Sequence, residues 1–306
     1  MKKFLSLILA AMMLLSVSAF AETVEVPAMK VSAPAGAPGL ALATLAVQAP
    51  ENYTFVAAET ISAEFASANA DFIIAPINAG AKLFKMGKST YQLAAVVCWG
   101  NLYIASQKEG FTLDDLNGGK VVLFGENTIN ASVVKYAMEK NGYAPATVEY
   151  LGSAANTQAL LLSDAEAIVV TAEPALTAAK MKNDKITAYA VNDLYKAATG
   201  FEGYTQAGLF VKAETVANQP EAVEAFLKLV EASCIANTED VAAVAEAAVA
   251  LELLPNVKVA TAAIPGCAIR FMSALEAKEQ VELTANVDLT QFGGAVPADE
   301  FYYGAK

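Results

Sequence analysis

Val31-Ser32-Ala33-Pro34-Ala35-Gly36-Ala37-Pro38-Gly39-Leu40 is the stretch that decides how this sequence folds. It ends an apolar run typical of a strand and begins an Ala/Leu-rich pattern typical of a helix. A strand that leads through a Pro/Gly turn into a helix presents free backbone N–H groups, which can bind a small ligand without charged side chains. The stretch therefore predicts an α/β protein with a candidate binding turn at residues 36–39.

The same strand-turn-helix unit recurs downstream. Asp71-Phe72-Ile73-Ile74-Ala75 is typical of a buried strand, and Pro76-Ile77-Asn78 follows it as the first turn of a helix. Residues 92–98 and 102–106 form either a hairpin or consecutive strands. Further strands are expected at 24–31, 53–57, 120–124, 148–151, 165–170, 186–191 and 205–212. Helices are expected at 39–47, 61–66, 129–141, 220–237, 241–253 and 268–281.

The strand-helix order resets after Trp99-Gly100-Asn101 and returns at Gly200-Phe201-Glu202-Gly203-Tyr204. Two α/β lobes linked by two chain crossings explain this order. We expect a discontinuous lobe of residues 22–102 and 205–306, with residues 103–204 inserted as the other lobe.

The first 21 residues have the features of an export signal. A basic start at Lys2 and Lys3 precedes an apolar run, and Ala19-Phe20-Ala21 fits signal-peptidase cleavage. No cysteine follows to accept a lipid, and no later apolar run is long enough to span a bilayer. We expect an unlipidated mature protein that begins at Glu22, inserts in no membrane and is periplasmic or secreted.

Composition excludes several function classes. The net charge of −12 becomes −14 without residues 1–21, and an acidic surface disfavours nucleic acid and anionic membranes as partners. The absence of histidine excludes Ser-His-Asp and Cys-His machinery and imidazole zinc sites. Cys98, Cys234 and Cys267 are widely spaced, so we expect three buried or partly buried thiols and no metal site.

The ordered motifs resemble one family. Residues 33–39, Asp71-Phe72-Ile73-Ile74-Ala75-Pro76, the Thr112-Leu113-Asp114-Asp115-Leu116-Asn117-Gly118-Gly119-Lys120-Val121 passage, Ala172-Glu173-Pro174 and Pro220-Glu221-Ala222-Val223-Glu224-Ala225-Phe226 are similar to motifs of periplasmic solute-binding proteins of ABC importers. The resemblance is to the group that serves nitrate, sulfonates, taurine and thiamine-pyrimidine precursors. It covers nearly all the mature chain. It implies the type II periplasmic-binding fold, with two lobes, a hinge and a ligand cleft.

The resemblance also implies where the ligand lies, namely at turns that follow strands and begin helices. It points to these residues: Gly36, Ala37, Pro38, Gly39, Pro76, Ile77, Asn78, Gly125, Glu126, Asn127, Thr128, Thr171 and Glu173. The glycines are alternatively explained by turn geometry alone, and Asn78, Asn127 and Thr128 by helix capping.

Four further residues are candidates from their type and position. Trp99, the only tryptophan, would stack on a planar ligand or pack at the hinge, and Phe201 and Tyr204 pose the same choice. Arg270, the only arginine, would bind an anion or form a surface salt bridge. Glu126 and Glu173 would repel anions, so they favour an amine or a neutral heterocycle.

These features together predict a receptor that captures a small solute by lobe closure. We expect no cofactor and no catalysis, a monomeric state, and an ABC permease with its ATPase as partners. Two alternatives stay open: an exported structural or adhesion protein, and an enzyme on the same fold. The second is disfavoured because the related thiamine-pyrimidine synthases depend on a histidine, which this chain lacks.

Overall fold

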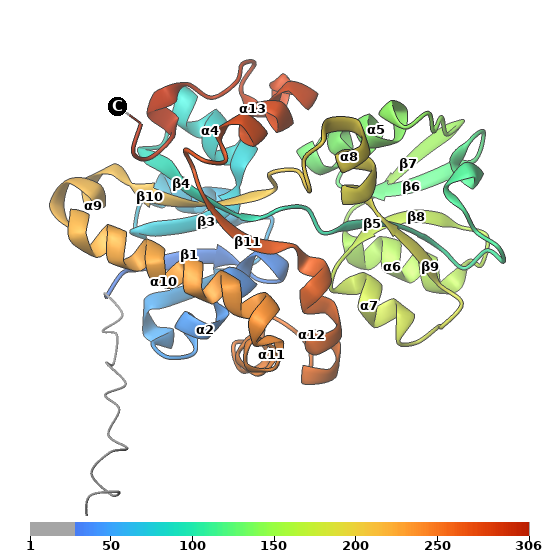
Figure 1. The fold of residues 1–306 in the computed structure, drawn as a ribbon, viewed down its shortest axis with the longest axis horizontal. Coiled ribbons are helices and arrows are strands. Elements are labelled where there is room, and N and C mark those ends of the chain that lie inside the picture. The colour runs from blue at the N-terminus through green and yellow to red at the C-terminus, as the bar shows by residue number, and fades with distance from the viewer. Residues whose placement is uncertain (1–27, 306) are drawn as a thin grey trace, which may run out of the picture.

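The computed structural model describes residues 28–305. The expected signal peptide and most of the strand expected at 24–31 lie outside the described residues. The described chain forms two α/β lobes side by side (Figure 1). The expected α/β fold with two lobes is confirmed.

The larger lobe is built on a six-stranded sheet with the order β11-β4-β10-β3-β1-β2. Its strands are β1 (Val31–Pro34), β2 (Tyr53–Val56), β3 (Phe72–Pro76), β4 (Tyr91–Cys98), β10 (Ala207–Lys212) and β11 (Ile269–Ser273). β1 is parallel to β2 and β3, whereas β10 runs antiparallel between β3 and β4. Parallel strands leave their carboxyl ends, and hence the turns that follow them, at one edge of the sheet.

Helices cover both faces of this sheet. α4 and α13 lie on one side of it, and α2, α10 and α11 lie on the other (Figure 1). The helices of this lobe are η1 (Ala37–Leu42), α2 (Ala43–Ala46), η2 (Pro50–Asn52), η3 (Ile61–Ala63), α3 (Glu64–Ser67), α4 (Ile77–Lys85), α9 (Ala213–Asn218), α10 (Pro220–Glu239), α11 (Val241–Ala250), α12 (Val257–Ala263), η5 (Ile264–Cys267), α13 (Lys278–Val287), η6 (Leu289–Phe292) and η7 (Asp299–Phe301).

The smaller lobe is built on a five-stranded sheet with the order β7-β6-β8-β5-β9. Its strands are β5 (Leu102–Ser106), β6 (Lys120–Phe124), β7 (Thr147–Leu151), β8 (Ile168–Ala172) and β9 (Thr187–Ala190). Its helices are η4 (Leu113–Leu116), α5 (Ile129–Lys140), α6 (Ala154–Ser163), α7 (Ala175–Lys180) and α8 (Val191–Thr199). Thr112 and Asp115 form a capping box that begins η4.

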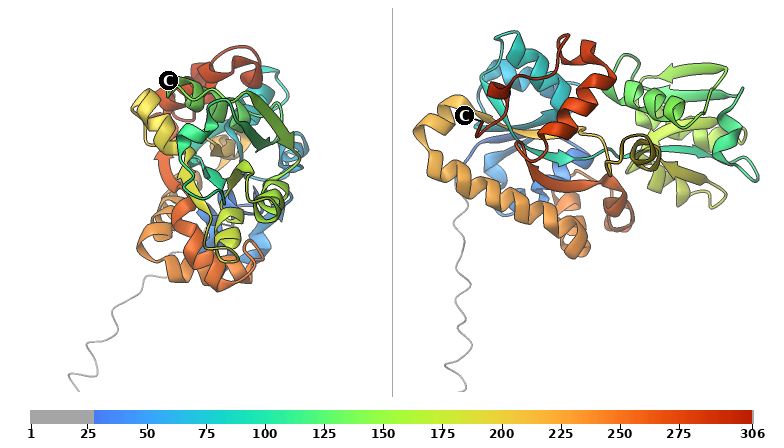
Figure 2. Two further views of the ribbon diagram at one scale, coloured as in Figure 1. Left: turned by 90° about the vertical axis from the view of Figure 1, so that its right-hand side faces the viewer. Right: turned by 45° about the horizontal axis from the view of Figure 1, so that its top comes forward.

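Two chain segments cross between the lobes, one from β4 to β5 and one from α8 to β10 (Figures 1 and 2). Each crossing has a buried aromatic residue, because Trp99 is 3% exposed and Tyr204 0%. Both residues belong to a hydrophobic cluster that continues from one face of the larger sheet into the smaller lobe. These two aromatic residues therefore join the crossings to a core that the lobes share.

The structure decides between two alternatives left open by the sequence and corrects one expected helix. Of the two alternatives for residues 92–106, consecutive strands are confirmed and a hairpin is excluded, because β4 and β5 follow each other in the chain but lie in different sheets. The expected helix at 268–281 is instead strand β11, paired with β4, followed by a helix that begins only at Lys278. Of the strand expected at 24–31, only residues 28–31 are described, and among these Val31 alone lies in a strand, β1.

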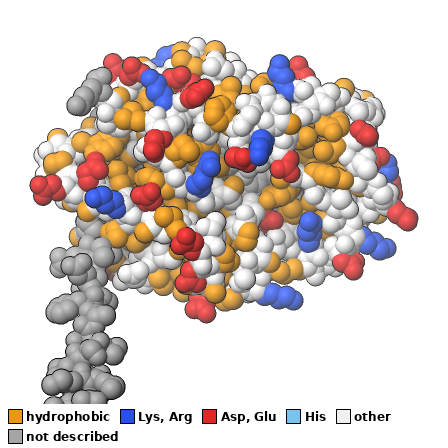
Figure 3. Space-filling model, in the orientation of Figure 1, with side chains coloured by type: hydrophobic (Ala, Val, Ile, Leu, Met, Phe, Trp, Pro, Cys, Tyr) orange, Lys and Arg blue, Asp and Glu red, His pale blue; other side chains and the backbone are white. Residues whose placement is uncertain are grey.

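The three cysteines are free and buried, as expected. Acidic and basic side chains are scattered over the face of the molecule that Figure 3 shows. Among residues 28–305, no helix combines the length and the apolar character that a membrane crossing requires.

Candidate functional site

A cavity of about 560 Å³ lies between the two lobes. Its wall consists mainly of turns that follow β1, β3, β6, β7 and β8, so both lobes contribute to it. The lobes touch beside it: Gln291 donates a hydrogen bond to the Asn127 carbonyl at 2.9 Å, and the Tyr103 hydroxyl donates to the Gly266 carbonyl at 3.1 Å. A small molecule held there would contact both lobes.

The turn after β1 begins the larger lobe's wall. Gly36 has φ 98°, a conformation that favours glycine, and it precedes the 3₁₀-helix η1. Gly39 has a different reason: a Cβ there would lie 2.9 Å from the Pro34 carbonyl oxygen and 3.3 Å from the Phe55 ring. Gly36 therefore shapes the cavity, and Gly39 allows the turn to pack against β2.

Asn78 carries the most informative polar group of this wall. It is the second residue of α4, lines the cavity, and its Oδ1 is buried without a hydrogen-bond partner in the described protein. Buried polar atoms are normally paired, and leaving one unpaired costs about 1–3 kcal/mol. The arrangement fits an oxygen that accepts a hydrogen bond from a bound ligand.

In the smaller lobe, the turn after β6 leads into α5. Gly125 and Asn127 have φ of 70° and 58°. Thr128 caps the helix, because its Oγ1 accepts a hydrogen bond from the Ala131 N–H at 3.3 Å and donates one to the Gly125 carbonyl at 2.6 Å. The capping explanation of Thr128 therefore holds, although the residue also lines the cavity.

A second small-lobe turn was not among the sequence candidates. Gly152 and Ser153 follow β7, line the cavity and begin α6, where Ser153 Oγ accepts a hydrogen bond from the Asn156 N–H at 3.3 Å. The sequence signal was present, because Gly-Ser directly after an apolar run is the same strand-turn-helix pattern as at residues 34–39.

Glu173 lies at the cavity with its carboxylate turned to its own chain. It is 8% exposed, and its oxygens accept hydrogen bonds from the Thr177 N–H at 3.0 Å and the Thr177 hydroxyl at 2.9 Å. Burial raises the pKa of Glu173, and the bonds from Thr177 lower it only in part. The group is a buried acid that holds the start of α7.

This raised pKa predicts a pH dependence of stability. Between the ordinary value of 4.5 and the raised pKa, the folded protein binds more protons at Glu173 than the unfolded chain does. The contribution of Glu173 to the free energy of unfolding therefore increases as pH falls through that window. Urea unfolding of wild type and Glu173→Gln at several pH values measures this. As pH is lowered, the free energy of unfolding of wild type should rise relative to that of the variant. A difference independent of pH would contradict this.

A chain of hydrogen bonds links three residues that line the cavity, Asn101, Glu173 and Gln206. The Asn101 amide donates to the Glu173 carbonyl at 2.9 Å, and Gln206 Nε2 donates to Asn101 Oδ1 at 3.2 Å. Gln206 Oε1 in turn accepts from the Cys98 thiol at 3.3 Å. Burial raises the pKa of Cys98 to about 12, so this thiol stays protonated at neutral pH.

The titratable side chains that line the cavity are acidic. Among the described residues that line it, Glu59 and Glu173 are the only titratable ones, and Phe124 is the only aromatic one. An anion bound there would lie near two carboxyl groups with no cationic side chain beside it, so the lining disfavours anions.

The structure brings nine of the sequence candidates together at this cavity: Gly36, Ala37, Pro38, Pro76, Asn78, Gly125, Asn127, Thr128 and Glu173. Gly39, Ile77, Glu126 and Thr171 do not line it. Ile77 and Thr171 are each 0% exposed and point into the packed interior, whereas Glu126 is exposed.

The four aromatic and cationic candidates also lie outside this cavity. Tyr204 is fully buried and donates a hydrogen bond to Asn130 at 2.9 Å, and Phe201 packs against the shared hydrophobic cluster. Trp99 and Arg270 line a separate cavity. The Trp99 ring does not line the inter-lobe cavity, where it could stack on a ligand, but lies beside Arg270 at the separate cavity.

Residues 28–305 contain no group of three or more cysteine, aspartate or glutamate side chains placed to hold a metal ion. The cavity instead offers backbone N–H groups at helix starts and amide and hydroxyl groups. This arrangement is suited to reversible binding.

Comparison with solved structures identifies the architecture. An ABC transporter protein from Parabacteroides distasonis has a TM-score of 0.77 at 20% identity, over 91% of this chain and 99% of that one. The chain has the fold of ABC-transporter binding proteins. The ligand-binding component of an ABC-type import system from Staphylococcus aureus, solved with zinc bound, has a TM-score of 0.69 at 13% identity, over 91% and 98% of the two chains.

The periplasmic aliphatic sulphonate binding protein SsuA from Escherichia coli has the same fold, with a TM-score of 0.70 at 13% identity over 91% of this chain and 92% of that one. Residues 100–240 match the family model described as NMT1/THI5 like. No curated protein matches the sequence. The resemblance expected from the sequence is confirmed.

Proposed function

We propose that this protein is an extracytoplasmic solute-binding receptor that captures a small molecule between its lobes and delivers it to an ABC importer. The observation that carries the proposal is the inter-lobe cavity, which is lined by helix starts from both lobes and by the unpartnered Asn78 Oδ1. The architecture shared with ABC-transporter binding proteins supports it.

The receptor works by a shift of population between an open and a closed form. Contacts such as Gln291 with Asn127 and Tyr103 with Gly266 join the lobes only when these are close together. A ligand that touches both walls favours the closed form, which a membrane permease with its ATPase then recognises. Export directed by residues 1–21 places the protein in the periplasm or outside the cell.

The protein acts as a receptor without catalysis. Its sequence has no histidine to serve as a general base. Both carboxylate oxygens of Glu173 already accept hydrogen bonds from Thr177. The raised pKa of Cys98 disfavours a thiolate nucleophile.

The solute is neutral or cationic and carries hydrogen-bond donors. Glu59 and Glu173 disfavour an anion at the cavity, and Asn78 Oδ1 accepts from an N–H or O–H group. A thermal-shift screen of the mature protein against amines, amino acids, pyrimidines, sulfonates and inorganic anions tests this. An amine or neutral heterocycle should raise the melting temperature most. A sulfonate or inorganic anion as the tightest ligand would refute the charge argument.

Asn78→Ala is expected to weaken binding of the best ligand from that screen by about tenfold, the effect of losing a hydrogen bond worth about 1.4 kcal/mol. Calorimetric titration of wild type and variant measures the change. Asn218→Ala is the matched control, because Asn218 is exposed and away from the cavity. Equal affinities of Asn78→Ala and wild type would remove Asn78 from the site.

A further inference from the structure

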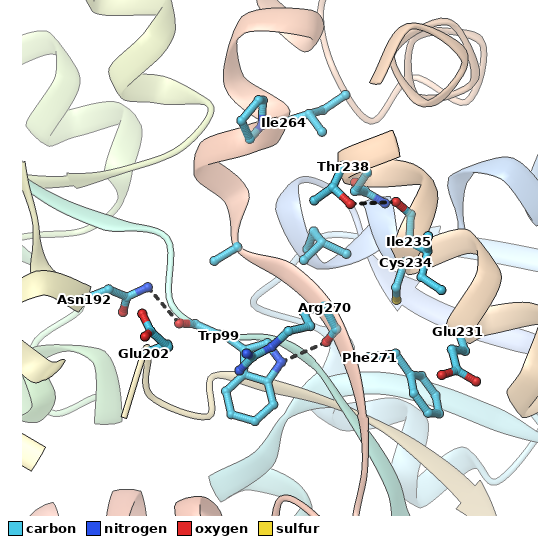
Figure 4. A pocket seen from close by; sticks show the side chains of 14 residues that line it. Trp99, Asn192, Glu202, Glu231, Cys234, Ile235, Thr238, Ile264, Arg270 and Phe271 are labelled. Atoms are coloured by element: carbon cyan, nitrogen blue, oxygen red, sulfur yellow. Dashed lines mark hydrogen bonds between the residues drawn. The ribbon is translucent and has the colours of Figure 1, made fainter. Parts of the chain in front are cut away.

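A second cavity, of about 380 Å³, lies beside the crossings and shares no lining residue with the inter-lobe cavity. One side of it is formed by α10 and another by η5 and β11 (Figure 4). Trp99, Asn192 and Glu202 come from the crossings and from the start of α8. The cavity is therefore bordered by both the larger lobe and the segments that join it to the smaller one.

Arg270 lies at this cavity, exposed to solvent and with its guanidinium beside an aromatic ring. Its guanidinium carbon lies 4.3 Å from the centroid of the Trp99 ring, and Trp99 Nε1 donates a hydrogen bond to the Arg270 carbonyl at 2.8 Å. Stacking on an aromatic face leaves the N–H edge of the guanidinium free. Among the described residues no carboxylate forms a salt bridge with Arg270, so this edge can bind a carboxylate from outside.

Several hydrogen-bond acceptors lie elsewhere on the wall of this cavity. Glu202 and Asn192 lie together on one side of Arg270 in Figure 4, and Glu231 lies on α10 on the other. Oδ1 of Asn192 and Oδ1 of Asn237 are buried without partners, and Asn237 is only 2% exposed. Glu202 already contacts the exposed Lys196 at 2.6 Å. Unpartnered acceptors beside carboxylates favour a ligand that also carries an ammonium group.

The remaining wall is apolar. Ile235, Ile264 and Phe271 line the cavity, and its volume exceeds what a single water molecule needs. A ligand that complements the arginine, the acceptors and the apolar wall has one carboxylate, one ammonium group and an apolar side chain.

We propose that this cavity is a second binding site, for a small zwitterion of the amino-acid type. Its carboxylate binds the N–H edge of Arg270, its ammonium group binds Glu202 and Asn192, and its side chain lies against Ile264 and Phe271. Because Asn192 belongs to α8 of the smaller lobe and Arg270 to β11 of the larger, the occupant bridges the crossings. Its binding is therefore coupled to the relative position of the lobes.

Titration of the protein with each standard L-amino acid singly, by thermal shift and calorimetry, tests the site. At least one amino acid with an apolar side chain should bind. Arg270→Gln should weaken it by about tenfold or more, and Glu202→Gln, a change at an exposed side chain, should weaken it as well. Acetate and ethylamine, each carrying one of the two charges, should bind far more weakly. Asn78→Ala, in the inter-lobe cavity, should leave this affinity unchanged.

The proposal is overturned if no amino acid binds, or if Arg270→Gln and Glu202→Gln both bind as wild type does. Loss of binding in Asn78→Ala with retention in Arg270→Gln would place the amino acid in the inter-lobe cavity and also overturn it. Near-ultraviolet circular dichroism verifies the fold of each variant, and Glu202→Gln decides the matter if Arg270→Gln does not fold.

Discussion

Gly203→Ala is expected to lower the free energy of unfolding by about 3 kcal/mol, the upper part of the range for overpacking a close-packed interior. Gly203 is buried on the α8–β10 crossing, and a Cβ there would lie 2.3 Å from the carbonyl oxygen of Trp99 on the other crossing. A backbone atom cannot rotate away as a side chain can. The two crossings would have to separate, and with them the core that continues between the lobes.

The same carbonyl accepts a hydrogen bond from Asn192 Nδ2 at 3.0 Å, so the displacement also disturbs this bond. Urea unfolding of the variant measures the loss. Gly152→Ala is the matched control, because its Cβ would meet only Asn156 Oδ1, at an ordinary 3.5 Å. If the two variants unfold at the same urea concentration, close contact between the crossings is not a source of stability.

Most elements of the fold could be predicted because their patterns are local. The strand at Phe72–Pro76 and the helix that begins at Pro220 carry their own hydrophobic and proline signals. β11 could not, because Ile269–Ser273 becomes a strand by pairing with the distant β4. Ala268 separates this strand from η5 and has a left-handed conformation, with φ 53°. An alanine does not signal that conformation in a sequence.

Some features of the candidate site could likewise be predicted from the sequence, and others could not. Turns such as those at Gly36 and Gly125 were predictable because a strand, a glycine and a helix start follow one another in the sequence. Which way the side chains of Trp99 and Tyr204 point depends on how the two crossings pass each other. The sequence holds no local signal for that geometry. Arg270, predicted as an anion-binding candidate, instead lies at the second cavity, together with Trp99.

The other large effect is expected from Gly266→Val, which should weaken binding of the inter-lobe ligand by about thirtyfold, equivalent to about 2 kcal/mol of destabilisation of the closed form. Gly266 lies in η5 of the larger lobe and lines neither cavity. A Cβ at this position would lie 2.8 Å from the Tyr103 hydroxyl and 3.0 Å from Cγ of Glu173, both in the smaller lobe. The added side chain therefore separates the lobes without touching the ligand.

Glu173 cannot easily move aside, because Thr177 holds both of its carboxylate oxygens. The Tyr103 side chain can instead be shortened by mutation. In the double variant Gly266→Val with Tyr103→Phe the hydroxyl is absent, so part of the affinity that Gly266→Val loses should be restored. Tyr103→Phe alone, which costs only the 3.1 Å hydrogen bond to the Gly266 carbonyl, should weaken binding much less. Calorimetry gives the four affinities, and small-angle scattering should show Gly266→Val staying extended with ligand present. Wild-type affinity in Gly266→Val would mean that ligand binding does not require the lobes to meet at this contact.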